Sequence, residues 1–231
     1  MKTVGIIGGI GPESTIEYYR LILAGYRERQ EDGSSASIII NSIDLKKLLD
    51  LVAAKALAAV ADYLAGEVQK LAAAGADFGL LASNTPHIVF AELARRSEIP
   101  LLSIVEVTCA AAKSQGLKKL GLFGTRFTMT GGFYPEVFSR EGIALAMPQP
   151  VEQDYIHQKY LGELVDGIIK PETRAGLVAI ASRMKEDEGI EAVILGGTEL
   201  PLILHPGSSS EIPLLDTTRI HAEAVVERIF A

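Results

Sequence analysis

Three polar side chains in two parts of the chain have the types and spacing that proton transfer requires. Ser83 lies four residues before His87 in a helix that Pro86 opens, so the imidazole would stand one turn from the hydroxyl and could act as its base. Ser83 could be a nucleophile, a proton relay or a ligand-binding hydroxyl, and since no Gly-x-Ser-x-Gly sequence surrounds it, ligand binding is favoured. Glu199 follows a second apolar run, where a carboxylate could orient a substrate ammonium group or serve as a base with a pKa raised by burial. Structural roles stay open, since His87 could satisfy backbone groups and Glu199 could stabilise a helix N-terminus.

Short runs rich in Val, Ile, Leu and Gly alternate with long amphipathic stretches, a pattern typical of βαβ units around a buried parallel sheet. The fold class is therefore α/β, and the sheets are expected to be mostly parallel. The clearest predicted helix spans Ala53 to Ala74 and ends at Gly75, the usual left-handed residue beyond a helix. Strands are predicted at residues 3–8, 37–41, 78–82, 101–102, 119–123, 192–195 and 213–215.

An internal repeat with an offset of about 115 residues indicates two pseudo-symmetric α/β domains. Residues 4–9 match 120–125, residues 80–85 match 194–199, and residues 99–103 match 212–216. The last pair ends in Ser103 and Asp216, which are both good N-caps for a following helix. The repeat predicts a first domain of residues 1–102 plus 214–231 and a second of residues 103–213. A single doubly wound sheet with recurring strand chemistry is the alternative.

Polar residues follow the predicted strands of both halves. Because ligands of parallel α/β sheets bind at the carboxyl ends of the strands, two such domains would place these residues around a shared cleft. Short side chains and backbone amides suit a small ligand that carries carboxylates. The candidate substrate-binding residues are Gly9, Ile10, Asn41, Asn84, Thr85, Thr125, Thr128, Thr130 and Thr198.

Four motifs follow one another along the chain: Gly8-Gly9-Ile10-Gly11-Pro12-Glu13-Ser14-Thr15, Ser83-Asn84-Thr85-Pro86-His87, Gly124-Thr125 through Thr130, and Gly196-Gly197-Thr198-Glu199-Leu200-Pro201. In order and spacing they resemble the aspartate/glutamate racemase superfamily, in its aspartate racemase branch, over essentially the whole chain. The resemblance implies a cofactor-independent isomerase of a small amino acid or dicarboxylate that needs no pyridoxal phosphate and is usually a homodimer. It also implies one cysteine from each domain beside the substrate α-carbon, where one thiolate removes the proton and the opposite thiol returns one.

The resemblance places these two catalytic cysteines at Ser83 and Gly197, so the chain has a thiol at neither position. A serine hydroxyl needs a neighbouring base to do similar work, and a glycine can hold no proton. The single cysteine, Cys109, lies among alanines in a predicted helix and is expected to be a small buried filler. Open alternatives are a one-sided lyase, decarboxylase or tautomerase step that uses Ser83 with His87 or Glu199, and a catalytically inactive ligand-binding homologue.

The remaining charged groups have weaker patterns. Family members tend to place a cation for the distal carboxylate after the second strand, where Lys46 and Lys47 follow Asp44, although a solvated helix start is the default for these three residues. His157, Lys159 and Glu163 lie on a predicted helix, and most of them are expected to be surface or lid residues. His205 and His221 lack the spacing of metal ligands, so no metal is predicted.

Composition narrows the partners and the compartment. The 22 basic and 29 acidic residues give a formal charge of −7, which disfavours nucleic acid and anionic lipid as partners. One cysteine permits no disulfide framework, and neither a signal peptide nor an apolar stretch of membrane-spanning length is evident, so a cytoplasmic protein is expected. The first glycine loop has Ser14 where a dinucleotide fingerprint has its third glycine, and no cofactor is predicted.

Overall fold

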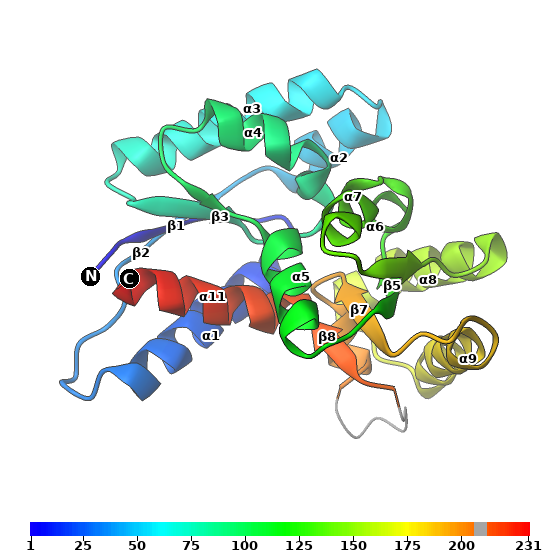
Figure 1. Ribbon diagram of the computed structural model, residues 1–231. Coiled ribbons are helices and arrows are strands. Elements are labelled where there is room, and N and C mark those ends of the chain that lie inside the picture. The colour runs from blue at the N-terminus through cyan, green and yellow to red at the C-terminus, as the bar shows by residue number, and fades with distance from the viewer. Residues whose placement is uncertain (206–211) are drawn as a thin grey trace. The chain divides into compact units, whose positions relative to one another are not determined.

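The computed structural model describes residues 1–205 and 212–231 (Figure 1). The chain folds into two compact units, of which unit 1 comprises Met1–Val107 with Thr218–Ala231 and unit 2 comprises Thr108–Thr217. The boundaries therefore fall inside one helix and near the start of another, a few residues beyond the positions expected from the repeat. Among the described residues, no helix is both long enough and apolar enough to cross a membrane.

Unit 1 is built on a four-stranded parallel sheet with the order β2-β1-β3-β4. Its strands are β1 (Val4–Gly8), β2 (Ile38–Ser42), β3 (Phe78–Leu81) and β4 (Leu101–Leu102). Its helices are α1 (Pro12–Arg29), α2 (Leu45–Ala53), α3 (Leu57–Ala73), the 3-10 helix η1 (Thr85–Val89), α4 (Phe90–Arg96), the first part of α5 (Ile104–Ser114) and α11 (Thr217–Phe230) from Thr218 onward.

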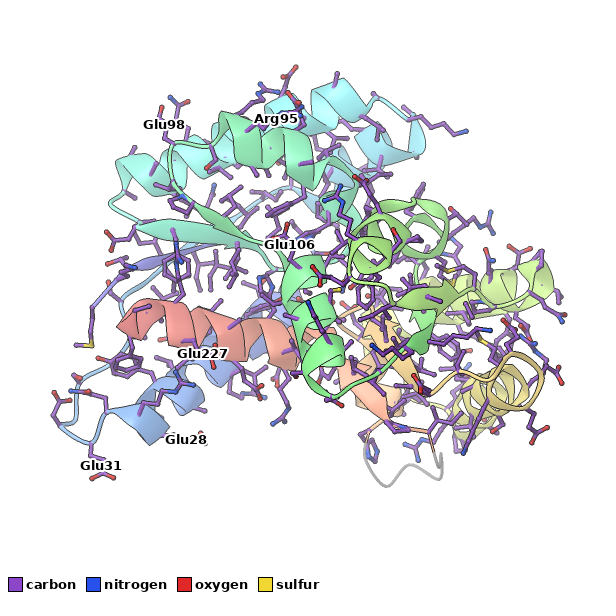
Figure 2. All side chains as sticks on the ribbon, viewed as in Figure 1. Glu28, Glu31, Arg95, Glu98, Glu106 and Glu227 are labelled. Carbon is purple, nitrogen blue, oxygen red and sulfur yellow. The ribbon has the colours of Figure 1, made fainter. Side chains whose placement is uncertain are left out.

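Helices cover both faces of this sheet, which explains why its central strands are apolar throughout. In Figure 1, α1 and α11 lie on one side of β1 and β3, and α3 and α4 lie on the other. Tyr18, Ile22 and Val226 from α1 and α11 pack with Val4 and Phe78 of the sheet. Every residue of β1 is buried, as expected for a parallel strand covered on both faces. Charged groups occupy the periphery, and Figure 2 shows Glu31 and Glu98 projecting outward from loops.

Unit 2 repeats this topology with the order β6-β5-β7-β8, again all parallel. Its strands are β5 (Lys119–Gly124), β6 (Ala144–Ala146), β7 (Ala192–Gly196) and β8 (Leu214–Asp216). Its further helices are α6 (Arg126–Thr130), α7 (Phe133–Arg140), α8 (Pro150–Gly162), the 3-10 helix η2 (Leu164–Asp166), α9 (Pro171–Glu188) and α10 (Leu200–Ile203). The apolar sides of α8 and α9, with Ile156, Leu177 and Met184, pack with Val193 and Leu195 of β7.

The predicted α/β class and the two parallel sheets are confirmed. The matched sequence segments fall on β1 and β5, on β3 and β7, and on β4 and β8, which hold equivalent places in the two strand orders. One strand, β6, was not predicted, because it has only three residues, one of them exposed, and so carries neither an apolar run nor a full alternation.

The predicted helix from Ala53 to Ala74 is wrong at its start. Helix α2 ends at Ala53, Lys55 has a positive φ of 54°, and α3 begins at Leu57. The backbone N–H of Ala56 donates to the carbonyl oxygen of Leu51 at 3.0 Å, which is the bond pattern of a helix that closes on a left-handed residue. Alanine-rich sequence favours helix on both sides of this break, so propensity alone does not reveal it. At the other end, Gly75 has the expected left-handed conformation, with φ 94°.

Candidate functional site

The end of β7 carries a buried carboxylate with two hydroxyl donors on one of its oxygens. β7 ends at Gly196, and Glu199, three residues on, is only 4% exposed. The phenol of Tyr160 donates a hydrogen bond to Oε2 of Glu199, and the hydroxyl of Thr198 donates to the same oxygen at 2.8 Å. Oε1 accepts no hydrogen bond from the residues that the structure describes. The carboxylate is therefore held through Oε2, and Oε1 is left as its open acceptor.

The donor in this pair is the tyrosine. Tyr160 lies on α8 and is 7% exposed. Burial above all, and then the neighbouring Glu199 carboxylate, raise the pKa of Tyr160 well above its ordinary value. The phenol consequently keeps its proton at neutral pH and acts as the donor to Glu199.

The ring of Tyr160 also occupies the space in front of Gly197. A Cβ added to Gly197 would overlap Cε2 of Tyr160 and would lie 2.9 Å from Cζ and 3.0 Å from the hydroxyl oxygen. Position 197 and the Tyr160 ring therefore compete for one volume. The sequence pattern assigned Tyr160 only to the apolar spacing of its helix, because the partner lies 39 residues along the chain and no local pattern links the two.

Glu199 stands at the N-cap of α10, so the alternative of a carboxylate that stabilises a helix N-terminus stays open. Its carboxylate makes no capping hydrogen bond there. It bonds to Tyr160 and Thr198 instead.

The threonines after β5 mainly shape their own loop. Thr125 is the N-cap of α6, and its hydroxyl accepts the backbone N–H of Thr128 at 3.3 Å. The two hydroxyl oxygens are 3.2 Å apart. Thr130 is exposed and donates to the carbonyl oxygen of Arg126 at 2.8 Å. Nδ1 of His157 accepts the N–H of Arg126 at 3.2 Å, so this histidine also serves the loop.

In unit 1, the structure corrects the interpretation of His87 as the base for Ser83. Nδ1 of His87 is 3.0 Å from the carbonyl oxygen of Ser83, and Nε2 accepts the backbone N–H of Ile104 at 3.2 Å. Both ring nitrogens are thus used by the backbone, and neither bonds to the Ser83 hydroxyl. The ring is 3% exposed, and burial lowers the pKa of His87 to about 3. His87 is a neutral structural histidine, while Ser83 is half-buried at the end of β3.

The first glycine loop is closed by its own threonine. Gly9 has φ 75°, and its N–H donates to Oγ1 of Thr15 at 2.9 Å, so this amide is already paired. Oγ1 of Thr15 in turn donates to the carbonyl oxygen of Gly11 at 3.3 Å. A Cβ on Gly9 would lie 2.6 Å from the carbonyl oxygen of Ile43, which leaves room only for glycine. Gly9 therefore does not offer its amide to a carboxylate in this structure.

This bond predicts a stability loss in Thr15→Val. Valine keeps the branched shape that packs beneath Gly8 but leaves the buried Gly9 N–H without its acceptor. We expect the free energy of unfolding to fall by about 1–3 kcal/mol in urea titrations. Thr15→Ser, which keeps the oxygen, should lose less, and equal losses in the two variants would contradict the assignment.

The remaining residues after the strands of unit 1 are buried or paired. Nδ2 of Asn41 donates to Oε2 of Glu67 at 2.8 Å, and Asn84 and Thr85 are 2% and 9% exposed at the start of η1. Ile10 is 6% exposed.

Lys46 and Lys47, which follow β2, are both exposed and contact other residues of unit 1. Lys46 pairs with Asp50 at 2.6 Å on an exposed surface, and Lys47 lies 4.2 Å from the ring centroid of Tyr63. Asp44 caps α2 by accepting the N–H of Lys47. These contacts fit the solvated helix start that was the default interpretation.

The interpretation of Glu163 as a surface or lid residue is wrong. Glu163 is 6% exposed and binds Lys159 at 2.7 Å, Lys170 at 3.2 Å and the hydroxyl of Thr173 at 2.5 Å. The bond from Lys159, followed by that from Thr173, lowers the pKa of Glu163 to about 2. This network links η2 to the start of α9. Within the described ranges, no three His, Cys, Asp or Glu side chains form a group that could hold a metal ion.

Comparison with known proteins decides the family. The family model described as Asp/Glu/hydantoin racemase matches residues 7–225. The chain belongs to this family. A crystal structure from Yersinia pestis, named a putative Asp/Glu racemase, is 32% identical, with a TM-score of 0.92 and full coverage of both chains. An aspartate racemase homologue from Pyrococcus horikoshii OT3 is also 32% identical, with a TM-score of 0.87 and full coverage of both chains. An uncharacterized protein of Pectobacterium carotovorum subsp. carotovorum is 29% identical over 118 residues, which are 50% of this chain and 75% of that protein.

The single thiol of this racemase-family chain lies in its interior. Cys109, on α5, is 2% exposed, as expected for a small buried filler. Burial, and to a lesser extent the Glu141 carboxylate, raise the pKa of the Cys109 thiol. The thiolate form that attacks or abstracts protons is therefore disfavoured at neutral pH.

Proposed function

We propose that this racemase-family protein transfers a proton at the α-carbon of a small amino acid or dicarboxylate, aspartate-like or glutamate-like, without a cofactor. The observation that carries the proposal is Glu199, a buried carboxylate at the end of β7 whose Oε1 accepts no hydrogen bond from the described residues. Proton transfer by a positioned carboxylate is a common form of general base catalysis.

The thiols of the two-cysteine reaction have no equivalent in the proposed site. The resemblance puts them at Ser83 and Gly197, and Cys109 is buried in α5. His87 is not available as the base for Ser83, because both of its ring nitrogens bond to the backbone. We therefore propose one-sided chemistry in which a single group both removes and returns the proton.

In the proposed step, the carboxylate of Glu199 is the only base. The α-C–H bond breaks, the proton forms an O–H bond with Oε1 of Glu199, and the electron pair delocalises into the substrate carboxyl group. In the reverse direction Glu199 returns the proton, or a deuteron after exchange with deuterated water. Elimination of a β-substituent from the same carbanion would make the protein a lyase.

Proton NMR in deuterated water tests this function. The protein is incubated with L- and D-aspartate, L- and D-glutamate and small dicarboxylates, and the α-proton signal and any new species are followed. We expect exchange for at least one compound and a loss of about 100-fold or more in Glu199→Gln. Glu186→Gln, an exposed glutamate of α9, is the matched control and should exchange normally.

The second candidate is a ligand-binding homologue without catalysis, favoured by the absence of a thiol at both expected positions. It predicts a rise in melting temperature that grows with ligand concentration, because a ligand that binds only the native state stabilises it. It also predicts full retention of the α-proton. Exchange in the wild-type protein would eliminate this candidate.

We further propose a cytoplasmic homodimer whose ligand is a small molecule and not a nucleic acid, in line with the formal charge of −7. Light scattering coupled to size-exclusion chromatography should give twice the 24.7 kDa mass of the chain. A monomer mass at micromolar concentration would contradict the dimer.

A further inference from the structure

Tyr160 contacts both the carboxylate of Glu199 and the space in front of Gly197, where the chain has no side chain. We propose that Tyr160 is a positioning residue for Glu199. Its phenol binds Oε2 and leaves Oε1 free to face a substrate proton, while its ring fills the volume that a side chain at position 197 would need. The catalytic role of Tyr160 rests on the proposed function, whereas its contacts with Glu199 and Gly197 do not depend on that function.

Glu199 depends on neutral donors because no cation supports it. A buried carboxylate without partners is costly, and proteins usually pair it with Lys, Arg or several hydrogen-bond donors. In the described part of the chain, no Lys or Arg lies within 4.0 Å of Glu199. Lys159 is next to Tyr160 in sequence, yet it is engaged with Glu163. Hydroxyl donors from Tyr160 and Thr198 therefore take the place of a counter-ion.

The donors act on one oxygen only. Tyr160 and Thr198 both bond to Oε2, and neither bonds to Oε1. Because the high pKa of the phenol keeps its proton in place, Tyr160 cannot compete with Oε1 as a base near neutral pH. Within the Glu199 carboxylate, Oε2 is thus fixed by the two hydrogen bonds, and Oε1 is the oxygen that can accept a substrate proton.

Packing alone does not require the phenol oxygen. A phenylalanine ring would fill the same volume in front of Gly197 and would satisfy the apolar neighbours of α8 equally well. A tyrosine at this buried position brings a polar atom that must find a partner, and that partner is Glu199. Tyr160→Phe therefore separates the two roles, since it keeps the ring and removes only the donor.

The experiment compares wild type, Tyr160→Phe and the matched control Tyr155→Phe in the intact chain. Tyr155 lies on the same helix and contacts Gly176 instead of Glu199. The first readout is the carbon-13 chemical shift of the Glu199 side-chain carboxyl at neutral pH, assigned through its loss in Glu199→Gln. We expect this chemical shift to change in Tyr160→Phe, because the hydrogen bond from the phenol to Oε2 is lost. Tyr155→Phe should keep the wild-type chemical shift.

The second readout is the rate of α-proton exchange. If wild type exchanges, Tyr160→Phe should lower the maximal rate by roughly 10- to 100-fold with little change in KM. An unchanged carboxyl chemical shift in Tyr160→Phe overturns the inference whatever the activity. A changed chemical shift in Tyr160→Phe, together with a wild-type protein that exchanges nothing, supports the Tyr160–Glu199 pair and rejects only the proposed function. Exchange that is equally fast in wild type and Tyr160→Phe rejects the positioning role even if the chemical shift changes.

Discussion

Gly197→Ala is expected to lower the free energy of unfolding by about 1–3 kcal/mol, the usual cost of forcing an extra carbon into a packed interior. The new methyl group would overlap the Tyr160 ring, which is 7% exposed and bonded to Glu199. The ring could yield only by breaking that bond or by displacing helix α8. Most glycine-to-alanine changes at compatible backbone angles are neutral or stabilising, so the sign of this effect is diagnostic.

The cause is tested in a double-mutant cycle with Tyr160→Ala. Removing the ring is itself costly, by about 3–5 kcal/mol for a large buried aromatic residue. In that background Gly197→Ala should cost little or even gain stability, which gives a coupling energy of about the size of the original penalty. Urea titrations of the four proteins provide the cycle. Additive effects would mean that the space in front of Gly197 is not set by Tyr160.

Two buried histidines are expected to make the protein lose stability in mild acid. His87 and His221 are 3% and 0% exposed, and burial, the largest cause for both, lowers each pKa to about 3. Each is held in one neutral tautomer. Nε2 of His87 must stay unprotonated to accept the N–H of Ile104, while Nδ1 of His221, 2.7 Å from the hydroxyl of Tyr18, accepts from it because Nε2 faces the carbonyl oxygen of Leu102 at 3.2 Å.

The direction of the pH effect follows from the lowered pKa values. In the unfolded chain both histidines have an ordinary pKa near 6.5, so below that pH the unfolded state binds protons that the native state does not bind. The stabilising contribution of the two histidines is therefore fully present above pH 6.5 and decreases as the pH falls toward 3. We expect a loss of about 2 kcal/mol for each of the two histidines between pH 7.5 and 5. Glu163, with its pKa lowered to about 2, contributes only at lower pH, below its ordinary value of 4.5.

Urea titrations between pH 7.5 and 5 measure this loss. In His221→Gln the pH-dependent part should fall to about half, whatever the stability of the variant at neutral pH, and His87→Gln should behave alike. His157, which is only partly buried and has a lowered pKa, adds a smaller effect of the same sign. A wild-type stability that is flat over this range would show that the two rings can take up a proton in the native state.

The sequence by itself determined the class of the fold, its repeat and the polar ends of its strands. Parallel strands that are buried on both faces need continuous apolar runs, and such runs can be recognised in the sequence without knowing which strands pair with each other. Strand β6 and the break at Lys55 were not predicted. Each is a short segment whose conformation depends on its tertiary contacts, so the sequence shows no periodic hydrophobic pattern there. Cys109 was identified as a buried filler because it lies among alanines in a predicted helix, and the structure buries it.

Only the tertiary structure decided what the polar residues do. Ser83 and His87 have the spacing of a hydroxyl and its base, yet the imidazole is turned to two backbone groups, and sequence distance does not encode that orientation. Glu199 was a candidate from its place after a strand, whereas its partner Tyr160 was hidden in the apolar pattern of helix α8. Their contact joins residues 39 apart, and it forms because α8 packs on the sheet that ends beside Gly197. Local periodicity reports which face of an element is buried, but the direction of a single hydroxyl depends on packing among elements that are distant in sequence.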